Sequence, residues 1–399
     1  MLCVEEAQSI VLDNLPSMNA RAVPLLSAVA QVLAEDVVSE VDLPPFNKSA
    51  MDGYAVCSSD VENTPVTLDV IENIPAGCFP EKRIEPGQCA KIMTGAPVPE
   101  GADAVVMIEY TEENGKSKVS IQGSVKPYEN ICAFGEDLKK GELVLERGRT
   151  IRPQEVALLA ATGRTQVIVH CRPKVSILAT GSELAPPTET LGPGRIYDAN
   201  TPCLASLCRQ IGIVPEILGV APDNHKELSE KIAEGLRSDV LLVSGGVSVG
   251  DYDLVPGVLN EFGFNIRVAK VAMKPGKPTV FATKDDKVAF GMPGNPVSSF
   301  VAFTLFVAPA LKKMTGYKQP ELGPIALDAR LTEDVENHRK RRLYAPATLV
   351  CSGERWEVRP TENHGSADLV GLSHCNALME LPPKSAWKCD DTVRVIRLV

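Results

Sequence analysis

Four short segments of small and polar residues each follow an apolar run between residues 175 and 296 of the sequence. They comprise residues 180–184, 221–224, 244–253 and 291–296. Backbone N–H groups of glycine can approach a phosphate closely, so glycine-rich segments of this kind suit an anionic ligand. One such segment alone would be ordinary turn chemistry. Four together predict a phosphate- or nucleotide-binding edge.

Three of these segments also carry acids, namely Glu183, Asp223, Asp251 and Asp253. One or two carboxylates suffice to hold Mg²⁺ when phosphate oxygens complete its coordination shell. Each acid alone also has a structural interpretation: Asp223 would cap a helix, and Asp251 would be a solvated loop acid. The glycine pair Gly245-Gly246 is equally compatible with a tight turn, because neither a Walker A loop nor G-x-G-x-x-G is present.

Lysines suited to binding an oxyanion cluster around one turn. Lys270, Lys274 and Lys277 surround residues 271–273 and 275–276, and the string Lys-Pro-Gly-Lys-Pro at residues 274–278 would hold two ammonium groups on a stiff support. A plain surface turn is the equally weighted alternative. The basic run 338–342 is either a solvated face or the rim of the same anion site.

The elements that must position these residues follow a parallel-sheet pattern. Apolar runs alternate with helical segments, and the runs are residues 175–179, 214–220, 239–243, 279–282 and 288–290. Continuous apolar strands separated by helices indicate a parallel sheet covered on both faces. Ligands of such sheets bind outside the carboxyl ends of the strands, so the candidate residues are expected at one edge.

One helix of this sheet would point its positive end at that edge. Asn295-Pro296 has the pattern of a helix cap followed by proline at the first helical position. The partial positive charge of a helix N-terminus would then face the anion. We expect this helix to close the α/β domain, residues 173–321.

The rest of the chain predicts three further units. Helical periodicity runs through the first 40 residues, in two stretches on either side of Pro24. Residues 43–135 consist of short alternating runs with Gly and Pro, which indicates an inserted β-rich domain. A helix starting at Pro153 continues the first segment, so residues 1–42 and 136–172 are predicted to form a discontinuous, elongated linking domain. Residues 322–399 return to short β-type runs.

Bulk properties exclude several classes of protein. The chain has 399 residues, 44% of them hydrophobic, and a formal net charge of -10, which argues against a general nucleic-acid binder. Its 11 cysteines include no C-x-x-C pair, which is typical of a reduced cytoplasmic chain and argues against a zinc site. The first residues lack the pattern of a signal peptide, and the longest apolar run is shorter than a membrane span of about 20 residues. We therefore expect no membrane partner.

Five strings carry a resemblance to a known family, and they are residues 45–55, 91–96, 244–253, 273–278 and 291–298. In these strings, and over nearly its whole length, the chain resembles the molybdopterin molybdenumtransferases, to which the C-terminal domain of gephyrin also belongs. It implies a molybdopterin-binding α/β domain, a β-rich inserted domain, a helical and extended linking domain and a small C-terminal β-barrel. It also implies an elongated homodimer whose active cleft is shared between subunits.

The reaction that the resemblance implies converts adenylylated molybdopterin and molybdate into molybdenum cofactor and AMP, assisted by Mg²⁺. Matching positions imply catalytic roles for Asp52, Glu183, Asp223 and Asp253, the last three also as metal ligands. Outer molybdate contacts would come from Arg341 and Ser366. The implied substrate contacts are Thr94, Ser244, Gly245, Gly246, Ser248, Gly250, Lys270, Lys274, Lys277, Pro293, Gly294, Asn295 and Ser298.

Two alternatives remain open on the sequence. A molybdopterin adenylyltransferase shares the α/β domain and is also a candidate partner, whereas gephyrin-like domains act as non-enzymatic scaffolds. The chain departs from the family pattern at Cys132, Phe134 and Pro346, where the family commonly has basic residues. Substrate contacts from those positions are not expected here.

Overall fold

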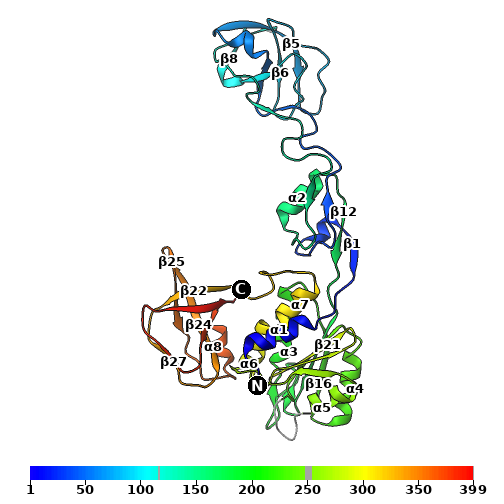
Figure 1. Cartoon of the computed structure of the whole chain (residues 1–399), viewed down its shortest axis with the longest axis vertical. Coiled ribbons are helices and arrows are strands. Elements are labelled where there is room, and N and C mark those ends of the chain that lie inside the picture. The colour runs from blue at the N-terminus through cyan, green and yellow to red at the C-terminus, as the bar shows by residue number, and fades with distance from the viewer. Residues whose placement is uncertain (116, 248–253, 399) are drawn as a thin grey trace.

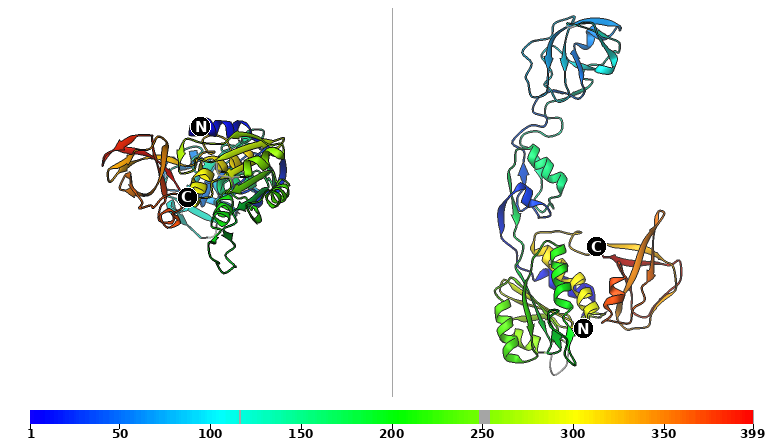
Figure 2. Two further views of the ribbon diagram at one scale, coloured as in Figure 1. Left: turned by 90° about the horizontal axis from the view of Figure 1, so that it is seen from below. Right: turned by 180° about the vertical axis from the view of Figure 1, so that it is seen from behind.

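The molecule is elongated, and its computed structural model describes residues 1–115, 117–247 and 254–398. A β-rich module lies at one end, a narrow linking unit in the middle, and an α/β unit beside a β-barrel at the other end (Figures 1 and 2). The arrangement agrees with the predicted fold class. The exact domain boundaries stay a prediction.

The α/β unit is built on a six-stranded sheet in the order β16-β13-β17-β21-β20-β18. The first four strands in this order are parallel, whereas β20 and β18 each run antiparallel to their neighbour. Each of the five apolar runs contains or overlaps one of these strands, as predicted. The prediction of a purely parallel sheet is wrong, however, because the run at residues 279–282 forms the antiparallel strand β20, and the edge strand β18 was not predicted. The strands are β13 (Val175–Thr180), β16 (Glu216–Ala221), β17 (Val240–Ser244), β18 (Asn265–Val268), β20 (Val280–Lys284) and β21 (Lys287–Met292).

Helices cover both faces of this sheet, which explains why its strands are apolar without alternation. Ile177 and Leu242 pack into the core beneath α3, α6 and α7, whereas Leu178 and Leu241 pack into a second core beneath α4 and α5. The helix α1 contributes Val4, Ala7 and Val11 to the first core and contacts α7. The helices are α1 (Val4–Asp13), α3 (Asn200–Gln210), α4 (His225–Gly235), α5 (Val255–Glu261), α6 (Pro296–Ala302) and α7 (Ala308–Met314).

The helix predicted after Asn295 begins as expected, with Asn295 as N-cap and Pro296 in the first turn. It continues through a π-helical turn, η4 (Phe303–Val307), into α7. The whole segment, residues 296–314, spans 19 residues. Among the described residues it is the one helix with the length and composition of a membrane span, but 72% of its most apolar stretch is buried inside the protein. Its apolar side chains belong to the core of the α/β unit.

The linking unit comprises β1, β2, β11, β12, α2 and the short 3-10 helix η1. The helix predicted at Pro153 is confirmed as α2, but the second helical stretch predicted in the first 40 residues is wrong. That stretch forms only one 3-10 turn, and residues 20–24 before it pair with β12, some 140 positions later. The elements are β1 (Ala20–Pro24), η1 (Leu25–Ala28), β2 (Val37–Val38), β11 (Leu143–Leu145), α2 (Pro153–Ala161) and β12 (Gln166–His170).

The β-rich module is a six-stranded sheet in the order β7-β4-β6-β5-β9-β8, with a short β3–β10 ladder beside it. Its two cores are small and lie on opposite faces of this sheet, with Val56 on one side and Ala55 on the other. The elements are β3 (Lys48–Ser49), β4 (Gly53–Val56), η2 (Ser58–Val61), β5 (Val66–Ile74), β6 (Gln88–Ile92), β7 (Ala104–Met107), η3 (Ile108–Tyr110), β8 (Thr111–Glu113), β9 (Lys118–Ile121) and β10 (Ile131–Cys132).

The C-terminal unit is a barrel, because β24-β25-β22-β28-β26 closes through a β24–β26 pairing. The short strand β19 of the α/β unit joins β24 in parallel, which fixes the barrel beside the lysine turn. The elements are β19 (Met273–Lys274), β22 (Ala326–Leu331), β23 (Val335–Asn337), β24 (Arg342–Ser352), β25 (Arg355–Pro360), α8 (Leu369–Ser373), β26 (Ala377–Leu381), β27 (Ser385–Trp387) and β28 (Thr392–Arg397). A small ladder of β14 (Leu184–Ala185) and β15 (Ile196–Tyr197) lies at the carboxyl edge of the sheet.

Candidate functional site

An open cleft of about 600 Å³ lies between the carboxyl edge of the sheet and the barrel. Its lining brings together most of the residues predicted from the α/β unit and the barrel. They come from the β13 loop, the lysine turn, the start of α6 and the loops of the barrel. The predicted residues in the lining are Glu183, Lys274, Lys277, Pro293, Gly294, Asn295, Ser298, Arg341 and Ser366.

The two described acids of the predicted metal site meet the same loop at the end of β13. Asp223 accepts hydrogen bonds from Thr180 Oγ1 at 3.1 Å and from the Ser182 backbone N–H at 3.0 Å. A Cβ built on Gly181 would lie 2.7 Å from Glu183 Oε2, so the Glu183 carboxylate folds over this glycine. The structural alternative for Asp223 is wrong, because Asn224 caps α4.

The predicted glycine pair lies at the point where the strand order reverses. After β13 the chain adds β16 on one side, and it then returns to add β17 on the other, so a crevice opens between β13 and β17. Ser244, at the end of β17, is buried. Gly245 and Gly246 follow with φ of 97° and 63°, a region that favours glycine.

Replacing Gly245 with alanine is expected to abolish activity and to destabilise the α/β unit. A Cβ at this position would lie 2.3 Å from the backbone oxygen of Thr180, so the two strand ends must separate. Gly257→Ala is the matched control, because Gly257 lies in α5 with nothing within 4 Å of its Cβ position and alanine favours helix by about 1 kcal/mol. Thermal unfolding and activity assays of both variants would check this, and an active, equally stable Gly245→Ala protein would contradict it.

The lysine turn forms the basic wall of the cleft. Lys274 and Lys277 line it, whereas Lys270 is exposed and lies outside the lining. Burial lowers the pKa of Lys274 from its ordinary value, and the nearby charges of Arg341 and Arg339 lower it further. An anion would relieve this repulsion between cations, so the corner is electrostatically suited to one.

The barrel contributes the opposite wall. Arg341 Nη1 donates to the backbone oxygen of Met273 at 2.9 Å, directly before Lys274. The backbone oxygen of Ser366 accepts a hydrogen bond from the N–H of Val297 at 3.1 Å, and its Oγ accepts one from Asn295 Nδ2 at 3.1 Å. These bonds join the barrel to the first turn of α6, so the cleft exists only where the two units meet.

Sequence reasoning missed Asn200, which lines the cleft at the start of α3 and is buried. Its Nδ2 donates to Ser244 Oγ at 2.8 Å and to the backbone oxygen of Gly294 at 2.7 Å. Asp198 caps the same helix start, since its Oδ1 accepts from the backbone N–H groups of Asn200 and Thr201. The signal was the string Asp-Ala-Asn before Thr-Pro, but a polar helix start alone does not reveal which strand ends it contacts.

Asp52 and Thr94 lie far from this cleft, in the β-rich module at the other end of the molecule (Figure 1). Thr94 donates to Asp52 Oδ1 through its backbone N–H at 2.7 Å and its hydroxyl at 2.8 Å. These two bonds, the backbone bond first, hold the pKa of Asp52 below its ordinary value. The pair forms a second polar site, and within one chain this site lies far from the cleft.

Part of the predicted site falls in residues 248–253. Ser248, Gly250 and Asp253 lie outside the described residues, as does Asp251. Among the residues that the structure does describe, no three acidic, histidine or cysteine side chains are grouped closely enough to hold a metal ion.

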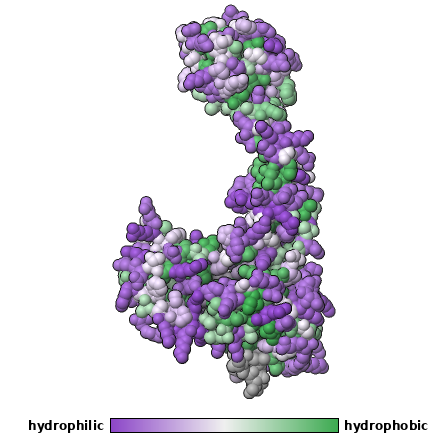
Figure 3. All heavy atoms as spheres, viewed as in Figure 1, coloured by the Kyte–Doolittle hydropathy of each residue, from purple (hydrophilic) through white to green (hydrophobic). Residues whose placement is uncertain are grey.

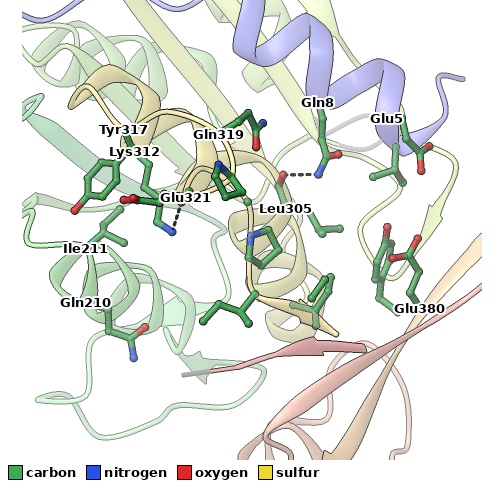
Figure 4. Close-up of a pocket in the computed structure, with 18 of the residues that line it drawn as sticks. Glu5, Gln8, Gln210, Ile211, Leu305, Lys312, Tyr317, Gln319, Glu321 and Glu380 are labelled. Carbon is green, nitrogen blue, oxygen red and sulfur yellow. Dashed lines mark hydrogen bonds between the residues drawn. The ribbon is translucent and has the colours of Figure 1, made fainter. Parts of the chain in front are cut away.

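A larger cleft, of about 980 Å³, lies between α1, the end of α3, residues 317–326 and the barrel (Figure 4). Several of its charged groups already have partners: Arg342 pairs with Glu5 and Glu380, and Lys312 Nζ donates to the backbone oxygen of Glu321 at 2.9 Å. Its lining contains none of the predicted site residues that the structure describes. We therefore place the functional site in the smaller cleft.

Comparisons with known proteins match one family over nearly the whole chain. Residues 2–163 match the MoeA N-terminal region (domain I and II), residues 176–313 a probable molybdopterin binding domain, and residues 328–398 the MoeA C-terminal region (domain IV). A molybdopterin molybdenumtransferase from Staphylococcus epidermidis is 37% identical over 99% of this chain and 95% of its own length. A molybdopterin molybdenumtransferase from Nostoc sp. is 36% identical over 96% of this chain and 90% of its own length.

A solved structure is similar over its full length. The molybdopterin biosynthesis moeA protein from Pyrococcus horikoshii OT3 superposes with a TM-score of 0.83 at 33% identity, covering 100% of both chains. Fold, cleft and likeness together define a multidomain protein of molybdenum cofactor biosynthesis. The chain belongs to the molybdopterin molybdenumtransferase family, whose members are transferases.

Proposed function

We propose that this chain transfers molybdenum from molybdate to molybdopterin, with adenylylated molybdopterin as substrate and AMP as the leaving group. The observation that carries the proposal is the convergence of Lys274, Lys277 and Arg341 beside the polar strand ends of one cleft. Such cations bind a tetrahedral dianion, while backbone N–H groups at the strand ends suit the phosphates of the adenylylated pterin. Developing negative charge on the phosphates would be stabilised by the same preorganised donors.

The donor set at the β13 loop fits Mg²⁺. Glu183 and Asp223 supply two carboxylates at one loop, and Mg²⁺ commonly takes one or two carboxylates with substrate phosphate oxygens and water as further ligands. These residues would hold the ion, with Asp253 as the third acid of the proposed set. When bound, Mg²⁺ would polarise the phosphoanhydride. Within the chain, the bonds from Thr180 and Ser182 orient Asp223 toward this task.

A homodimer would complete the site. Asp52 and Thr94 are held rigidly together, yet they lie at the end of the molecule remote from the chain's own cleft. The linking unit also exposes large apolar side chains, visible as green surface in its part of Figure 3, which a second copy would cover. These exposed residues are Leu26, Val29, Val38, Leu143 and Ile168.

Molybdate-dependent release of AMP from adenylylated molybdopterin tests the proposal. We expect release with molybdate and Mg²⁺ together and little with either omitted. Formation of adenylylated product from ATP and free molybdopterin would instead favour the adenylyltransferase alternative, and no AMP release under any condition would favour a scaffold.

All 11 cysteines are free thiols, which fits the proposed cytoplasmic location.

A further inference from the structure

The basic loop of the barrel, residues 338–341, is held from inside by one side chain. Asn337, at the end of β23, is completely buried. Its Nδ2 is within hydrogen-bonding distance of three backbone oxygens, those of Arg341 at 3.1 Å, Leu381 at 3.2 Å and Pro382 at 2.8 Å. Its Oδ1 accepts the backbone N–H of Arg339 at 3.1 Å.

These bonds determine where the loop can lie. One carboxamide joins both ends of the loop, through Arg339 and Arg341, to the end of β26 at Leu381. A buried amide whose donors and acceptor are all satisfied is a rigid connection, because any displacement would leave a polar group unpaired. The loop cannot shift without breaking several of these bonds together.

The loop in turn carries a wall of the anion corner. Arg341 lines the cleft and donates to the backbone oxygen of Met273 at 2.9 Å, and the N–H of Arg342 donates to the backbone oxygen of Ala272 at 3.2 Å. Lys274 follows directly on the other wall. The spacing between the guanidinium of Arg341 and the ammonium of Lys274 therefore depends on the loop.

We propose that Asn337 is a positioning residue that sets the affinity of the cleft for molybdate by holding Arg341 opposite Lys274. The inference rests on the proposed function for the identity of the anion. Asn337 does not itself line the cleft, so it acts through the loop. A purely structural role in the barrel is the competing explanation, and the experiment must separate the two.

Asn337→Asp is the sharpest variant, because it keeps the shape and the Oδ1 acceptor but presents a carboxylate oxygen to three carbonyl oxygens. We expect the Kd for molybdate, measured by calorimetry on the full-length protein, to rise at least about tenfold, as misplaced binding groups cost that much or more. The Arg341→Ala variant should raise it as well, and the double variant should add little to either single change.

Asn376→Asp is a control in the same barrel with the same change of side chain, at an exposed position. Asn376 also bridges backbone groups, with Nδ2 donating to the Leu349 oxygen at 2.9 Å and Oδ1 accepting its N–H at 2.6 Å. Its variant should lose stability without a change in molybdate Kd. An equal rise in Kd for this control would show general loosening of the barrel and overturn the inference.

If the Asn337→Asp variant does not fold, Asn337→Ser tests the same inference, since a hydroxyl keeps one donor and adds no charge. A folded variant with unchanged Kd would overturn the inference, as would a wild-type protein that does not bind molybdate. The wild-type protein binding molybdate without releasing AMP would refute the proposed function alone. The two failures are therefore distinguishable.

Discussion

Replacing Lys274 with alanine is expected to reduce kcat/KM for molybdate by about 10²-fold, the scale at which a preorganised donor to a developing or bound oxyanion contributes. Lys274 lines the cleft on a short strand that pairs with β24 of the barrel, so its backbone is fixed at the wall of the cleft. Initial rates over a range of molybdate concentrations would check this. Lys226→Ala, at an exposed position in α4, should leave the rates unchanged.

The same lysine predicts a pH dependence. Burial and the charges of Arg341 and Arg339 lower the pKa of Lys274 below its ordinary value of 10.5. Only the protonated form attracts the anion, so molybdate affinity is expected to fall as the pH rises through this lowered pKa. Bound molybdate favours the charged form, so saturating molybdate should move the midpoint upward. Lys274→Ala should lack this alkaline limb, and an identical profile in both proteins would contradict the assignment.

Much of the cleft could be predicted because it depends on local patterns and one general rule. Apolar runs identified the strands, the residues after them identified the loops, and parallel topology brought those loops to one edge. Asn295-Pro296 identified a helix start from two residues alone. These features need no knowledge of distant pairing.

The features that were missed all depend on contacts between distant segments. Residues 25–33 have an apolar pattern compatible with helix, but only the 3-10 turn η1 forms there, directly after a strand that pairs with the distant β12. Asn200 forms hydrogen bonds with Ser244 and Gly294, and no spacing in the sequence predicts that these three residues lie together. Asn337 precedes a basic run that suggests an exposed face, yet its own side chain is completely buried.

Pairing an Asp52→Ala chain with a Lys274→Ala chain is expected to restore activity well above that of either variant alone. In the proposed dimer each cleft takes its α/β unit from one chain and its β-rich module from the other. A mixed dimer then has one cleft with both residues intact and one with neither. Doubly tagged mixed dimers, purified after co-expression, should show about half of the wild-type rate per dimer.

A second mixed dimer controls for this result. Lys274→Ala paired with Glu183→Gln places both changes in α/β units, since both residues line the same cleft of one chain. Every cleft then has one defect, so no activity should return. Restoration in both mixtures would mean that pairing merely stabilises the variants, and restoration in neither would contradict the shared cleft. Restoration in the first alone requires Asp52 to act on the other chain's cleft, which the separation of the two sites within one molecule already favours.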